Sequence, residues 1–545
     1  MLLAEVAATS DAVAATRSRL AKRAALADLL RRAAPDGEAG RPGDDVEIVV
    51  SYLAGELRQR RTGLGWASLR SLPPPAEFPT LTVEAVDATF EEMAALSGPG
   101  SDAARSAAST ALFAAATERE QSFLRGLVAG DLRQGALDAL VVDAVAEAAG
   151  VPVDAVRRAV MLRGATGPVA RAALEATGPT AALAALAGFG LEVGRPVRPM
   201  LAQSAPDVAA AFDKLGVPPA ADDPGHRVSV DVKLDGIRIQ VHRNGTEVRV
   251  FTRSLDDITS RVPEIVADAR SLASERFVLD GEALVVGPDG VARPFQETAA
   301  RSATRDAAGA GGGDADGAGG TDGAASEAAP AGALVLRPYF FDVLHADGAD
   351  LIDAPLHERL DVLDRVAGSF TVRRLATSSP GAAEEFFAEA VREGQEGVVV
   401  KSLDAPYAAG RRGAGWVKVK PRHTLDLVVL AVEWGSGRRT GLLSNIHLGA
   451  RDPQGGFVML GKTFKGMTDE MLRWQTERFL ALETSRTDDV VHVRPEQVVE
   501  IAFDGLQRST RYPGGLALRF ARVLRYRDDK TAAEADTIEA VRALA

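Results

Sequence analysis

Two hydrophobic periods follow one another along the chain and divide it. Up to about Gly194, apolar residues recur at three-to-four spacing, as in LTVEAVDATFEEMAAL and ALDALVVDAVAEAAG. This spacing predicts amphipathic helices, and helix-start signals at Ser101 and Pro152 separate them. The stretch GRPVRPMLA, from Gly194, is interrupted by prolines and predicts a linker.

A period of two begins at about Arg227. In VSVDVKLDGIRIQVHRNG, from Val228 to Gly245, apolar and polar residues alternate, which predicts strands, and Asn244-Gly245 predicts a tight hairpin turn. FVLDGEALVVGPDG and EGVVVKSL predict further short strands, with helices between them. From about Pro421 the chain is almost wholly strand-like, as in TLDLVVLAVEWGSG, LLSNIHLGARDPQGG, FVMLGKTF and VVEIAFDGLQRS. Runs spaced in this way predict a small barrel.

One segment, Ala303 to Ala333, follows neither period. It is rich in glycine, alanine and aspartate and contains no aromatic residue. Such a composition cannot bury enough apolar surface to offset the entropy of ordering. We therefore predict a disordered insertion at 303–333 within the middle of the chain.

The length and composition of the chain exclude several classes of protein. A chain of 545 residues is too long for one core and predicts roughly three domains. The absence of cysteine excludes disulfides, a thiol nucleophile and cysteine-ligated zinc or iron–sulfur sites. The first residues carry no signal-peptide pattern and no apolar run is long enough to span a bilayer, so we expect a cytoplasmic protein.

The charge is unevenly distributed. A net charge of −12 would argue against a nucleic-acid partner, but phosphates respond to local patches rather than to net charge. Basic residues cluster in YAAGRRGAGWVKVKPRH and in LRFARVLRYRDDK. A nucleic-acid partner therefore stays compatible with the sequence.

Lys233 is the candidate for covalent chemistry. It shares one face of its predicted strand with Asp231 and Asp235, and Arg238 follows after Gly236. A neutral lysine amine is a nucleophile, and nearby cations or a metal free its lone pair by lowering a pKa that is ordinarily about 10.4. Attack on an α-phosphate would give a covalent nucleotidyl-lysine, a reaction that also needs metal-binding carboxylates, cations for the phosphates and a surface on which the base can stack.

Candidates for the metal ligands, the phosphate-binding cations and the stacking surface follow Lys233 along the chain. Glu282 lies in FVLDGEAL and Glu396 begins EGVVVK, while Trp416, Lys418 and Lys420 share one face of WVKVK. Each residue taken alone also fits a solvated strand face. Their joint occurrence in this order favours a catalytic site over a set of unrelated solvated residues.

This ordered set resembles the nucleotidyltransferase motifs of ATP-dependent DNA ligases. KLDGIR (Lys233 to Arg238) resembles the nucleophile motif, and FTRSLDDIT, LDGEAL, PYFFDVLHADG, EGVVVK and WVKVK resemble the motifs that follow it. LRFARVLRYRDDK resembles the last motif, and the match runs from Pro199 to about Thr537. GLVAGDLRQGALDALVVDAVA is similar to the minor-groove-binding segment of the helical domain of larger ligases.

The resemblance implies a role for each matching residue. Lys233 would be the adenylylated nucleophile, and Lys418 and Lys420 would hold the α-phosphate. Asp231 stands where many relatives have glutamate against the adenine amino group, and Ala521 stands where the last motif usually has proline. The remaining roles are Asp235 and Arg238 around the ribose and the 5′-phosphate, Arg253 on ribose and phosphate, Glu282 and Glu396 on the metal with Glu282 also near the ribose, Phe341 on the adenine, and Arg519, Asp529 and Lys530 on the pyrophosphate.

The helical segment has a physical interpretation of its own. Gly130 and Gly135 in GDLRQG fit a turn that enters a helix, whose free amides could bind a phosphate. Arg133 could contact the DNA backbone or minor groove. An ordinary turn between two helices is the alternative.

The resemblance implies a multidomain fold and an activity. We expect an all-α DNA-binding domain at 1–194, an α+β nucleotidyltransferase core with ATP-grasp-like antiparallel sheets at 195–420, and a β-barrel of the OB-fold type at 421–545. The expected protein is a monomeric ligase without a membrane anchor, acting on the nucleoid, with ATP as substrate, nicked duplex DNA as partner and Mg²⁺ or Mn²⁺ as metal.

Two alternatives belong to other classes. An RNA ligase or an RNA-capping guanylyltransferase would share the lysine motif, but the helical region and LRYRDDK disfavour it. A non-catalytic DNA-binding protein with a degenerate core is disfavoured because Lys233, Glu282, Glu396 and Lys418 are all retained. NAD-dependent ligases usually carry a cysteine-ligated zinc module, which this chain cannot form.

Overall fold

A computed structural model gives the structure of the chain. It describes residues 1–34, 44–59, 62–132, 138–217, 228–287, 292–293, 296–298, 301, 335–408 and 415–544. The predicted insertion at 303–333 and the candidate DNA-contacting residues Arg133 and Gly135 lie outside these residues.

Helices form the N-terminal part of the described chain. The two long periodic stretches become α4 (Val83–Ala95) and α7 (Asp138–Ala149), as predicted. Fully buried side chains such as Leu3, Val49 and Phe90 form one apolar core between these helices and their neighbours. The other helices are α1 (Leu3–Ala15), α2 (Arg19–Ala33), α3 (Asp44–Leu53), α5 (Ser101–Ala115), α6 (Glu118–Ala129), α8 (Val153–Arg163), α9 (Thr166–Glu175) and α10 (Pro179–Ala187).

The middle of the chain builds two sheets that share no strand. The first has the strand order β1-β10-β9-β2-β8 and is covered by α11 (Val208–Leu215) and α15 (Pro380–Arg392). Its pairs are antiparallel except for β1 with β10. Its strands are β1 (Gln203–Ala205), β2 (Val228–Lys233), β8 (Arg374–Thr377), β9 (Gly397–Ser402) and β10 (Trp416–Val419).

The second sheet is antiparallel throughout, in the order β4-β3-β5-β6-β7. Helices α12 (Pro263–Ser271) and α14 (Leu356–Ala367) pack on it. The predicted hairpin is confirmed, because Asn244 pairs with Glu247 and Gly245 turns the chain with a φ of +63°. The strands are β3 (Ile237–Asn244), β4 (Glu247–Thr252), β5 (Arg276–Val286), β6 (Val335–Ala346) and β7 (Ala349–Asp350).

The C-terminal part is a seven-stranded antiparallel sheet with a separate two-stranded ribbon. The long strand β11 (His423–Trp434) pairs with three others, β12 (Leu443–Arg451), β15 (Val490–Val493) and β16 (Val498–Phe503), and β-bulges interrupt its register with β12. The remaining strands are β13 (Phe457–Thr463), β14 (Glu483–Arg486), β19 (Arg522–Tyr526), and β17 (Gly505–Arg508) with β18 (Leu516–Arg519) in the ribbon.

The expectation of an almost wholly strand-like end was wrong in one place. Helix α16 (Asp469–Ala481) follows β13, and the Thr468 hydroxyl accepts a hydrogen bond from the Met471 amide at its start. Leu472 and Phe479, seven residues apart, are buried on one face of this helix against the C-terminal core. A short helix, α17 (Ile538–Arg542), ends the fold.

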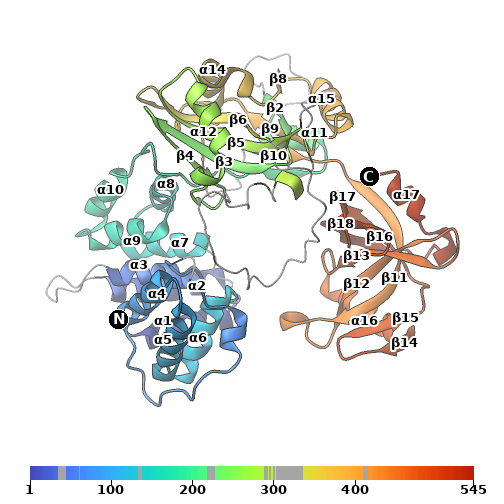
Figure 1. Cartoon of the computed structure of the whole chain (residues 1–545), viewed down its shortest axis with the longest axis horizontal. Coiled ribbons are helices and arrows are strands. Elements are labelled where there is room, and N and C mark those ends of the chain that lie inside the picture. The colour runs from blue at the N-terminus through green and yellow to red at the C-terminus, as the bar shows by residue number, and fades with distance from the viewer. Residues whose placement is uncertain are drawn as a thin grey trace.

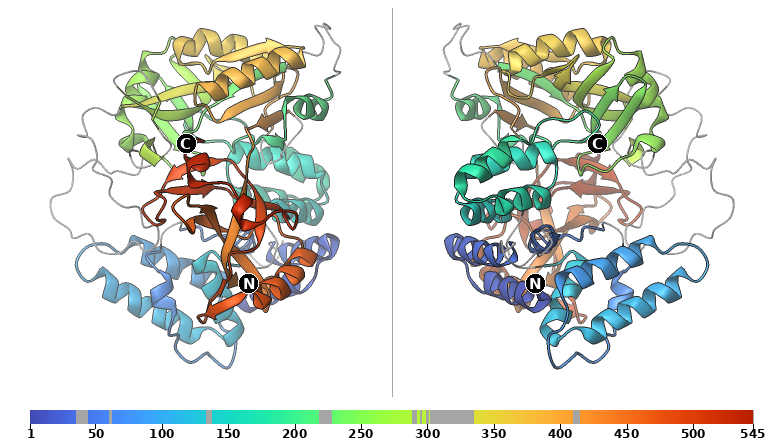
Figure 2. Two further views of the ribbon diagram at one scale, coloured as in Figure 1. Left: turned by 90° about the vertical axis from the view of Figure 1, so that its right-hand side faces the viewer. Right: turned by 90° about the vertical axis from the view of Figure 1, so that its left-hand side faces the viewer.

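The three parts are held together differently. The helical part and the C-terminal part lie on the same side of the two-sheet core, on the left and right of Figure 1. In both side views of Figure 2 the core is again at the top and the two other parts lie beneath it. Met161 and Leu162 of α8 are buried together with Met200 and Trp416, so an apolar cluster joins the helical part to the core. Among the described residues, none of the helices has the length and apolar content to cross a membrane.

Candidate active site

The nucleophile motif is the link between the two core sheets. Lys233 ends β2 of the first sheet, and Ile237 begins β3 of the second, so three residues carry the chain across. A Cβ on Gly236 would lie 2.4 Å from the Ala283 carbonyl oxygen, so only glycine fits where the link crosses β5. The glycine therefore fixes the position of Lys233 at the junction of the sheets.

Glu396 bridges two lysines. One of its oxygens accepts from Lys233 Nζ and the other pairs with Lys420 Nζ. Its backbone amide also donates to the Lys233 carbonyl at 3.1 Å. Burial works to raise the pKa of Glu396, but the charge of Lys233 and hydrogen bonds from both lysines outweigh burial, and the pKa is lowered.

Gly397 explains how Glu396 reaches both lysines. Its φ is +138°, and a Cβ there would lie 2.2 Å from the Val419 carbonyl oxygen. Because the backbone passes so close to the end of β10, the carboxylate of the preceding residue lies beside Lys420. Burial works to lower the pKa of Lys420, but Glu396 and Asp504 outweigh burial and raise that pKa.

Glu282, the second predicted metal carboxylate, lies on β5 directly opposite Arg238 of β3. Its Oε1 accepts from the Gly236 amide at 3.3 Å. Burial raises the pKa of Glu282 to about 7, against the opposing charges of Lys233 and Arg238. The sheet register thus brings both predicted metal carboxylates to the link that carries the nucleophile.

Arg238 is held behind this site. Its guanidinium donates to both oxygens of Asp280, at 3.1 and 2.6 Å, and to the Met200 carbonyl at 2.6 Å. The Tyr407 hydroxyl donates to the same Asp280 at 2.7 Å. Burial works to lower the pKa of Arg238, but Asp280 outweighs it and raises that pKa. In this conformation Arg238 anchors the linker at Met200 as well as facing the site.

Asp231 lies in the interior, although alternation placed it on a polar strand face. Its two oxygens engage Lys401 Nζ at 2.5 Å and the Ser229 hydroxyl at 2.5 Å, and both charged side chains are nearly fully buried. Lys401 Nζ also donates to the Phe341 carbonyl at 3.0 Å and lies 4.5 Å from the centre of the Trp416 ring. The first sheet is therefore buried on both faces, and its polar face is filled by an ion pair.

An aromatic corner surrounds that ion pair. The rings of Phe341 and Trp416 meet edge to face with centroids 5.8 Å apart. Phe341, the predicted stacking residue, is only partly buried. Lys418 is partly buried on β10 between Val417 and Val419, which are fully buried, so the predicted alternation of this strand is confirmed. Arg253 is exposed just beyond β4.

Arg519 and Asp504 of the C-terminal part make polar contacts with this site. Arg519 Nη1 donates to Asp235 at 2.8 Å, two residues after the nucleophile. Lys420 Nζ lies 3.2 Å from Asp504. The other predicted pyrophosphate residues pair elsewhere: Lys530 with Asp426 at 2.6 Å, and Asp529 with Arg527 at 2.7 Å.

Sequence reasoning missed Asp504, Asp280 and Tyr407 as parts of the site. Asp280 carried a signal, because it shares strand parity with Glu282 in FVLDGEAL. Asp504 lies after β16, outside all the matched motifs, and nothing in its spacing relates it to Lys420. This contact depends on the pairing of β11 with β16, whose register sets Phe503 opposite His423, close to Lys420.

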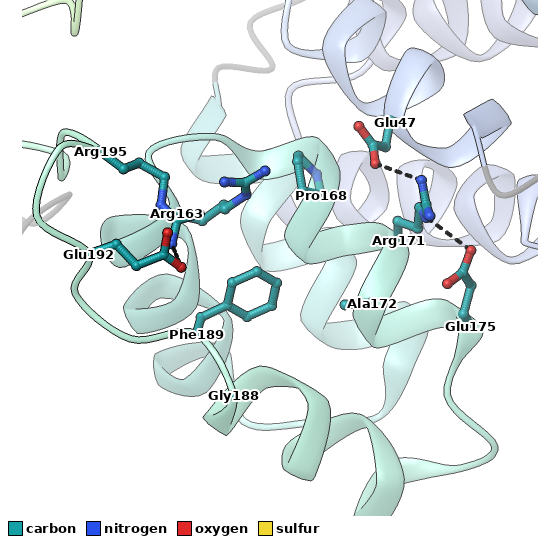
Figure 3. Close-up of a pocket in the computed structure, with 10 residues that line it drawn as sticks. All are labelled: Glu47, Arg163, Pro168, Arg171, Ala172, Glu175, Gly188, Phe189, Glu192 and Arg195. Carbon is teal, nitrogen blue, oxygen red and sulfur yellow. Dashed lines mark hydrogen bonds and ion pairs between the residues drawn. The ribbon is translucent and has the colours of Figure 1, made fainter.

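In the helical part, the described portion of the candidate DNA-contacting turn is Gly130 to Leu132. Gly130 ends α6 in the left-handed conformation with a φ of +64°, which confirms a turn there. A cavity of about 520 Å³ lies elsewhere in this part (Figure 3), where Arg171 bonds Glu47 and Glu175 and Arg195 bonds Glu192. Because these charges are paired within the cavity, we do not assign it to a nucleotide.

Comparison with known proteins identifies the family. Residues 199–420 match "ATP dependent DNA ligase domain", residues 439–530 match "ATP dependent DNA ligase C terminal region", and residues 67–146 match "DNA ligase N terminus". A "Probable DNA ligase" of Beutenbergia cavernae is 74% identical over 545 residues, all of both chains. Another from Nocardioides sp. is 61% identical over 544 residues, 99% of this chain and 98% of the relative.

The chain therefore belongs to the family of ATP-dependent DNA ligases, as its motifs predicted. It is an enzyme of that class with a multidomain architecture, and a covalent intermediate is the mechanism of the family. The solved structure "Pmar-Lig_PreS3" has a TM-score of 0.60 and 18% identity, covering 96% of this chain and 99% of that chain. This last likeness extends to the fold alone.

Proposed function

We propose that this chain seals nicks in duplex DNA by forming a covalent AMP adduct on Lys233 and passing the AMP to the 5′-phosphate of the nick. The 3′-hydroxyl would then displace AMP and close the backbone. The observation that carries the proposal is the position of Lys233 at the junction of two sheets, bridged through Glu396 to Lys420. This arrangement combines a nucleophile with a second cation for the phosphate that it attacks.

In the first step, Lys233 Nζ attacks the α-phosphorus of ATP. Its ammonium proton leaves to solvent, the Nζ–P bond forms as the bond from that phosphorus to the pyrophosphate oxygen breaks, and a second proton leaves the nitrogen. Lys418 and Lys420 neutralise the charge that grows on the α-phosphate. Arg519 lies at the same link, bonded to Asp235 at 2.8 Å, and with Asp529 and Lys530 it would orient the pyrophosphate.

The adenine would lie against Phe341, which is partly buried beside Trp416. Asp231 would read the amino group of the base, and Lys401 fixes the direction of its carboxylate at 2.5 Å. Asp235 and Arg253 would contact the ribose and the phosphates. Arg238 would contact the ribose and the nick 5′-phosphate after exchanging part of its bonding to Asp280.

The family typically uses a divalent metal, and Glu282 and Glu396 fit one. Both offer hard carboxylate oxygens at the link that carries Lys233. Burial raises the pKa of Glu282 to about 7, because the surrounding positive charge does not offset the loss of water around its carboxylate. A bound cation would supply the missing positive charge. Mg²⁺ or Mn²⁺, when bound, would neutralise phosphate charge during the transfer.

The domains have corresponding roles. An all-α domain at 1–194 would hold the duplex, with Gly130, Arg133 and Gly135 at the DNA backbone or minor groove. The core at 195–420 would hold ATP, and an OB-fold at 421–545 would close over it. We propose that the enzyme works as a monomer on the bacterial nucleoid in the cytoplasm, in DNA replication, repair or recombination.

The test is adduct formation with radiolabelled ATP. We expect Lys233→Ala to lose the covalent AMP adduct entirely, because no second amine would occupy the position of the nucleophile. Lys214→Ala is the matched control, since Lys214 is exposed and donates a hydrogen bond to the Ser204 carbonyl at 2.6 Å. The adduct is measured as label that stays on the protein through denaturing gel electrophoresis, and its release by acid but not by alkali identifies the P–N bond.

Three outcomes would contradict the proposal. Label retained by Lys233→Ala would remove Lys233 as the nucleophile. Label from GTP rather than ATP in the parent would favour a capping-type guanylyltransferase, and absence of label from either would favour a binding protein. Sealing of nicked DNA with ATP, NAD and GTP side by side separates these cases further.

A further inference from the structure

The linker that begins at Gly194 is bonded to the core along its backbone. The Val197 amide donates to the Gln240 side chain at 2.8 Å, and Gln240 donates back to the Val197 carbonyl at 3.2 Å. The Met200 amide donates to the Tyr407 hydroxyl at 2.9 Å. Because these backbone groups are fixed to β3 and to the segment after β9, the linker is not a flexible coil between two parts.

Arg198 extends from the same linker to the helical part. Its guanidinium donates to both oxygens of Asp138, at the start of α7, and to the Thr166 hydroxyl, at the start of α9, at 2.9 Å. The Thr166 hydroxyl itself donates to Asp138 at 2.7 Å. Arg198 Nε donates to the carbonyl of Gly164, just beyond α8, at 3.2 Å. One side chain therefore joins the ends of three helices to the linker.

The backbone is closely packed beside Arg198. Gly164 has a φ of +80°, and a Cβ there would lie 2.9 Å from the Pro196 carbonyl oxygen and 3.2 Å from Leu255 Cδ1. Leu255 lies in the core, in the turn after β4, and has a φ of +67°, which residues other than glycine rarely adopt. The end of α8, the linker and the core thus meet at one point, where both the positive φ and the small space require glycine.

Helix α8 also meets the core at a second point. Arg158 donates to both oxygens of Asp353, at 2.5 and 2.6 Å, and Asp353 lies between β7 and α14. Both side chains are exposed, so this ion pair adds little stability. Its value is geometric, because contacts at two separate points along α8 fix the direction in which the helical part leaves the core.

We propose that Arg198 is a positioning residue: it holds the helical part at one angle to the core, so that a duplex bound by the helical part presents its nick 5′-phosphate to the AMP on Lys233. This inference rests on the proposed function, which assigns the duplex to the helical part and ATP to the core. The Met200 carbonyl accepts from Arg238 at 2.6 Å, and Arg238 is the residue proposed to contact that phosphate. Arg198 itself touches no reacting atom.

A fixed angle matters for one step of the reaction. In the transfer step an oxygen of the 5′-phosphate attacks the phosphorus of the AMP, and Lys233 Nζ leaves with the electron pair of the broken N–P bond and takes up a proton. The two reactants are held on different parts, so a rigid connection removes the search over orientations before they react. Adenylylation needs only ATP and the core, so the angle of the helical part does not enter it.

The kinetic test compares these two steps. We expect Arg198→Met to form the AMP adduct at the parent rate but to transfer AMP to a nicked duplex about tenfold more slowly or worse. Transfer is measured in a single turnover, as label that moves from protein to DNA. Arg157→Met is the matched control. Arg157 is 26% exposed, as Arg198 is, and donates to Asp143 at 2.7 Å wholly within the helical part.

A crosslink separates positioning from folding. Since the chain has no cysteine, Arg158→Cys with Asp353→Cys supplies two thiols only, and a short bis-maleimide joins α8 to the core where the ion pair now stands. We expect the crosslink to leave transfer unchanged when Arg198 is present and to restore most of the rate that Arg198→Met loses. The same two thiols capped with N-ethylmaleimide should restore nothing.

Each other outcome has a definite meaning. Transfer at the parent rate in Arg198→Met, equal slowing of both steps, or a loss that the crosslink does not restore would overturn the positioning role. Loss of transfer on crosslinking the chain that retains Arg198 would also overturn it, because the helical part would then have to change its angle. A parent that forms no AMP adduct, or forms it and transfers none, would refute the proposed function and the positioning role with it.

Discussion

At the scale of single residues, one carboxylate organises the charged side chains of the site. The sequence predicted Glu396 as a metal ligand and Lys418 with Lys420 as a phosphate-binding pair. The structure couples Lys420 through Glu396 to Lys233, and Lys418 lies on β10 opposite Val399. Motif order could single out these residues as candidates, but the pairing of Glu396 with Lys420 depends on the close approach at Gly397, which no spacing reveals.

The buried His242 makes the stability of the fold depend on pH. It is 1% exposed on β3. Its Nδ1 accepts from the Gly194 amide at 3.0 Å, and Gln240 lies 2.8 Å from Nε2. Burial lowers the pKa of His242 to about 3, with Arg249 and His345 adding repulsion. Because the unfolded chain binds this proton near pH 6.5 and the folded chain does not, folding stability is lost as pH falls from 6.5 toward 3.

We expect the protonation of His242 in the unfolded chain to lower the free energy of unfolding by about 2 kcal/mol as the pH falls from 7 to 5. In His242→Asn, which cannot titrate there, the free energy of unfolding should fall less steeply over the same interval, although its value at pH 7 is lower. Urea unfolding at several pH values measures the difference. His357→Asn, at an exposed histidine, should keep the slope of the parent, and an equal slope in His242→Asn would contradict the assignment.

At the scale of elements, the hydrophobic period of the sequence predicted most of the helices and strands. The three-to-four spacing gave α4 and α7, and the alternation with Asn244-Gly245 gave the β3–β4 hairpin. Helix α16 was missed because the strand-like runs on both sides dominate the pattern, although Thr468 provides a cap. Alternation placed Asp231 on the polar face of β2, and that face is buried because a second strand supplies the counter-charge of Asp231.

The pair between β2 and β9 leads to a prediction about strand packing. Lys401→Met would leave the Asp231 carboxylate buried without its cation, since both side chains are almost inaccessible. We expect a loss of about 3–5 kcal/mol in the free energy of unfolding. Asp231→Asn combined with Lys401→Met should recover much of that loss. Urea unfolding followed by tryptophan fluorescence reports it, because Lys401 lies 4.5 Å from the Trp416 ring centre.

The exposed Lys214→Met serves as the control and should change stability by less than about 0.5 kcal/mol. If Lys401→Met were as mild as this control, the ion pair would not stabilise the sheet. If the double variant were no more stable than Lys401→Met, the cost would come from lost packing rather than from the unpaired carboxylate.

At the scale of the whole molecule, the kinds of contact differ between the two outer parts. Apolar side chains, Met161 and Leu162 among them, join the helical part to the core. Among the described residues, the C-terminal part meets the site through the ion pairs of Arg519 with Asp235 and of Asp504 with Lys420, and the Phe520 ring centre lies 6.0 Å from Lys420 Nζ. Polar contacts can be exchanged for water or phosphate at low cost, so the C-terminal part is the one suited to move. Sequence patterns could predict three domains but not this asymmetry.

Asp529 and Lys530 belong to the C-terminal part, and their substitution tests in which step of the proposed reaction that part takes part. In this structure Lys530 pairs with Asp426 at 2.6 Å and Asp529 with Arg527 at 2.7 Å, all within the C-terminal part. The proposed role of both residues is to orient the pyrophosphate, which is present only while ATP is bound. Interactions made in one step affect that step alone.

We therefore expect Asp529→Ala with Lys530→Ala to cripple adenylylation from ATP, by about a hundredfold if two charge-assisted contacts are lost, yet to permit joining of a nick that already carries 5′-AMP. Both substrates are compared in the double variant and the parent. Glu483→Ala with Arg486→Ala removes an exposed ion pair of the same C-terminal part and should leave both activities unchanged. Equal loss on the two substrates would place Asp529 and Lys530 in folding or DNA binding, because a residue that orients only pyrophosphate has no contact to lose once that group has departed.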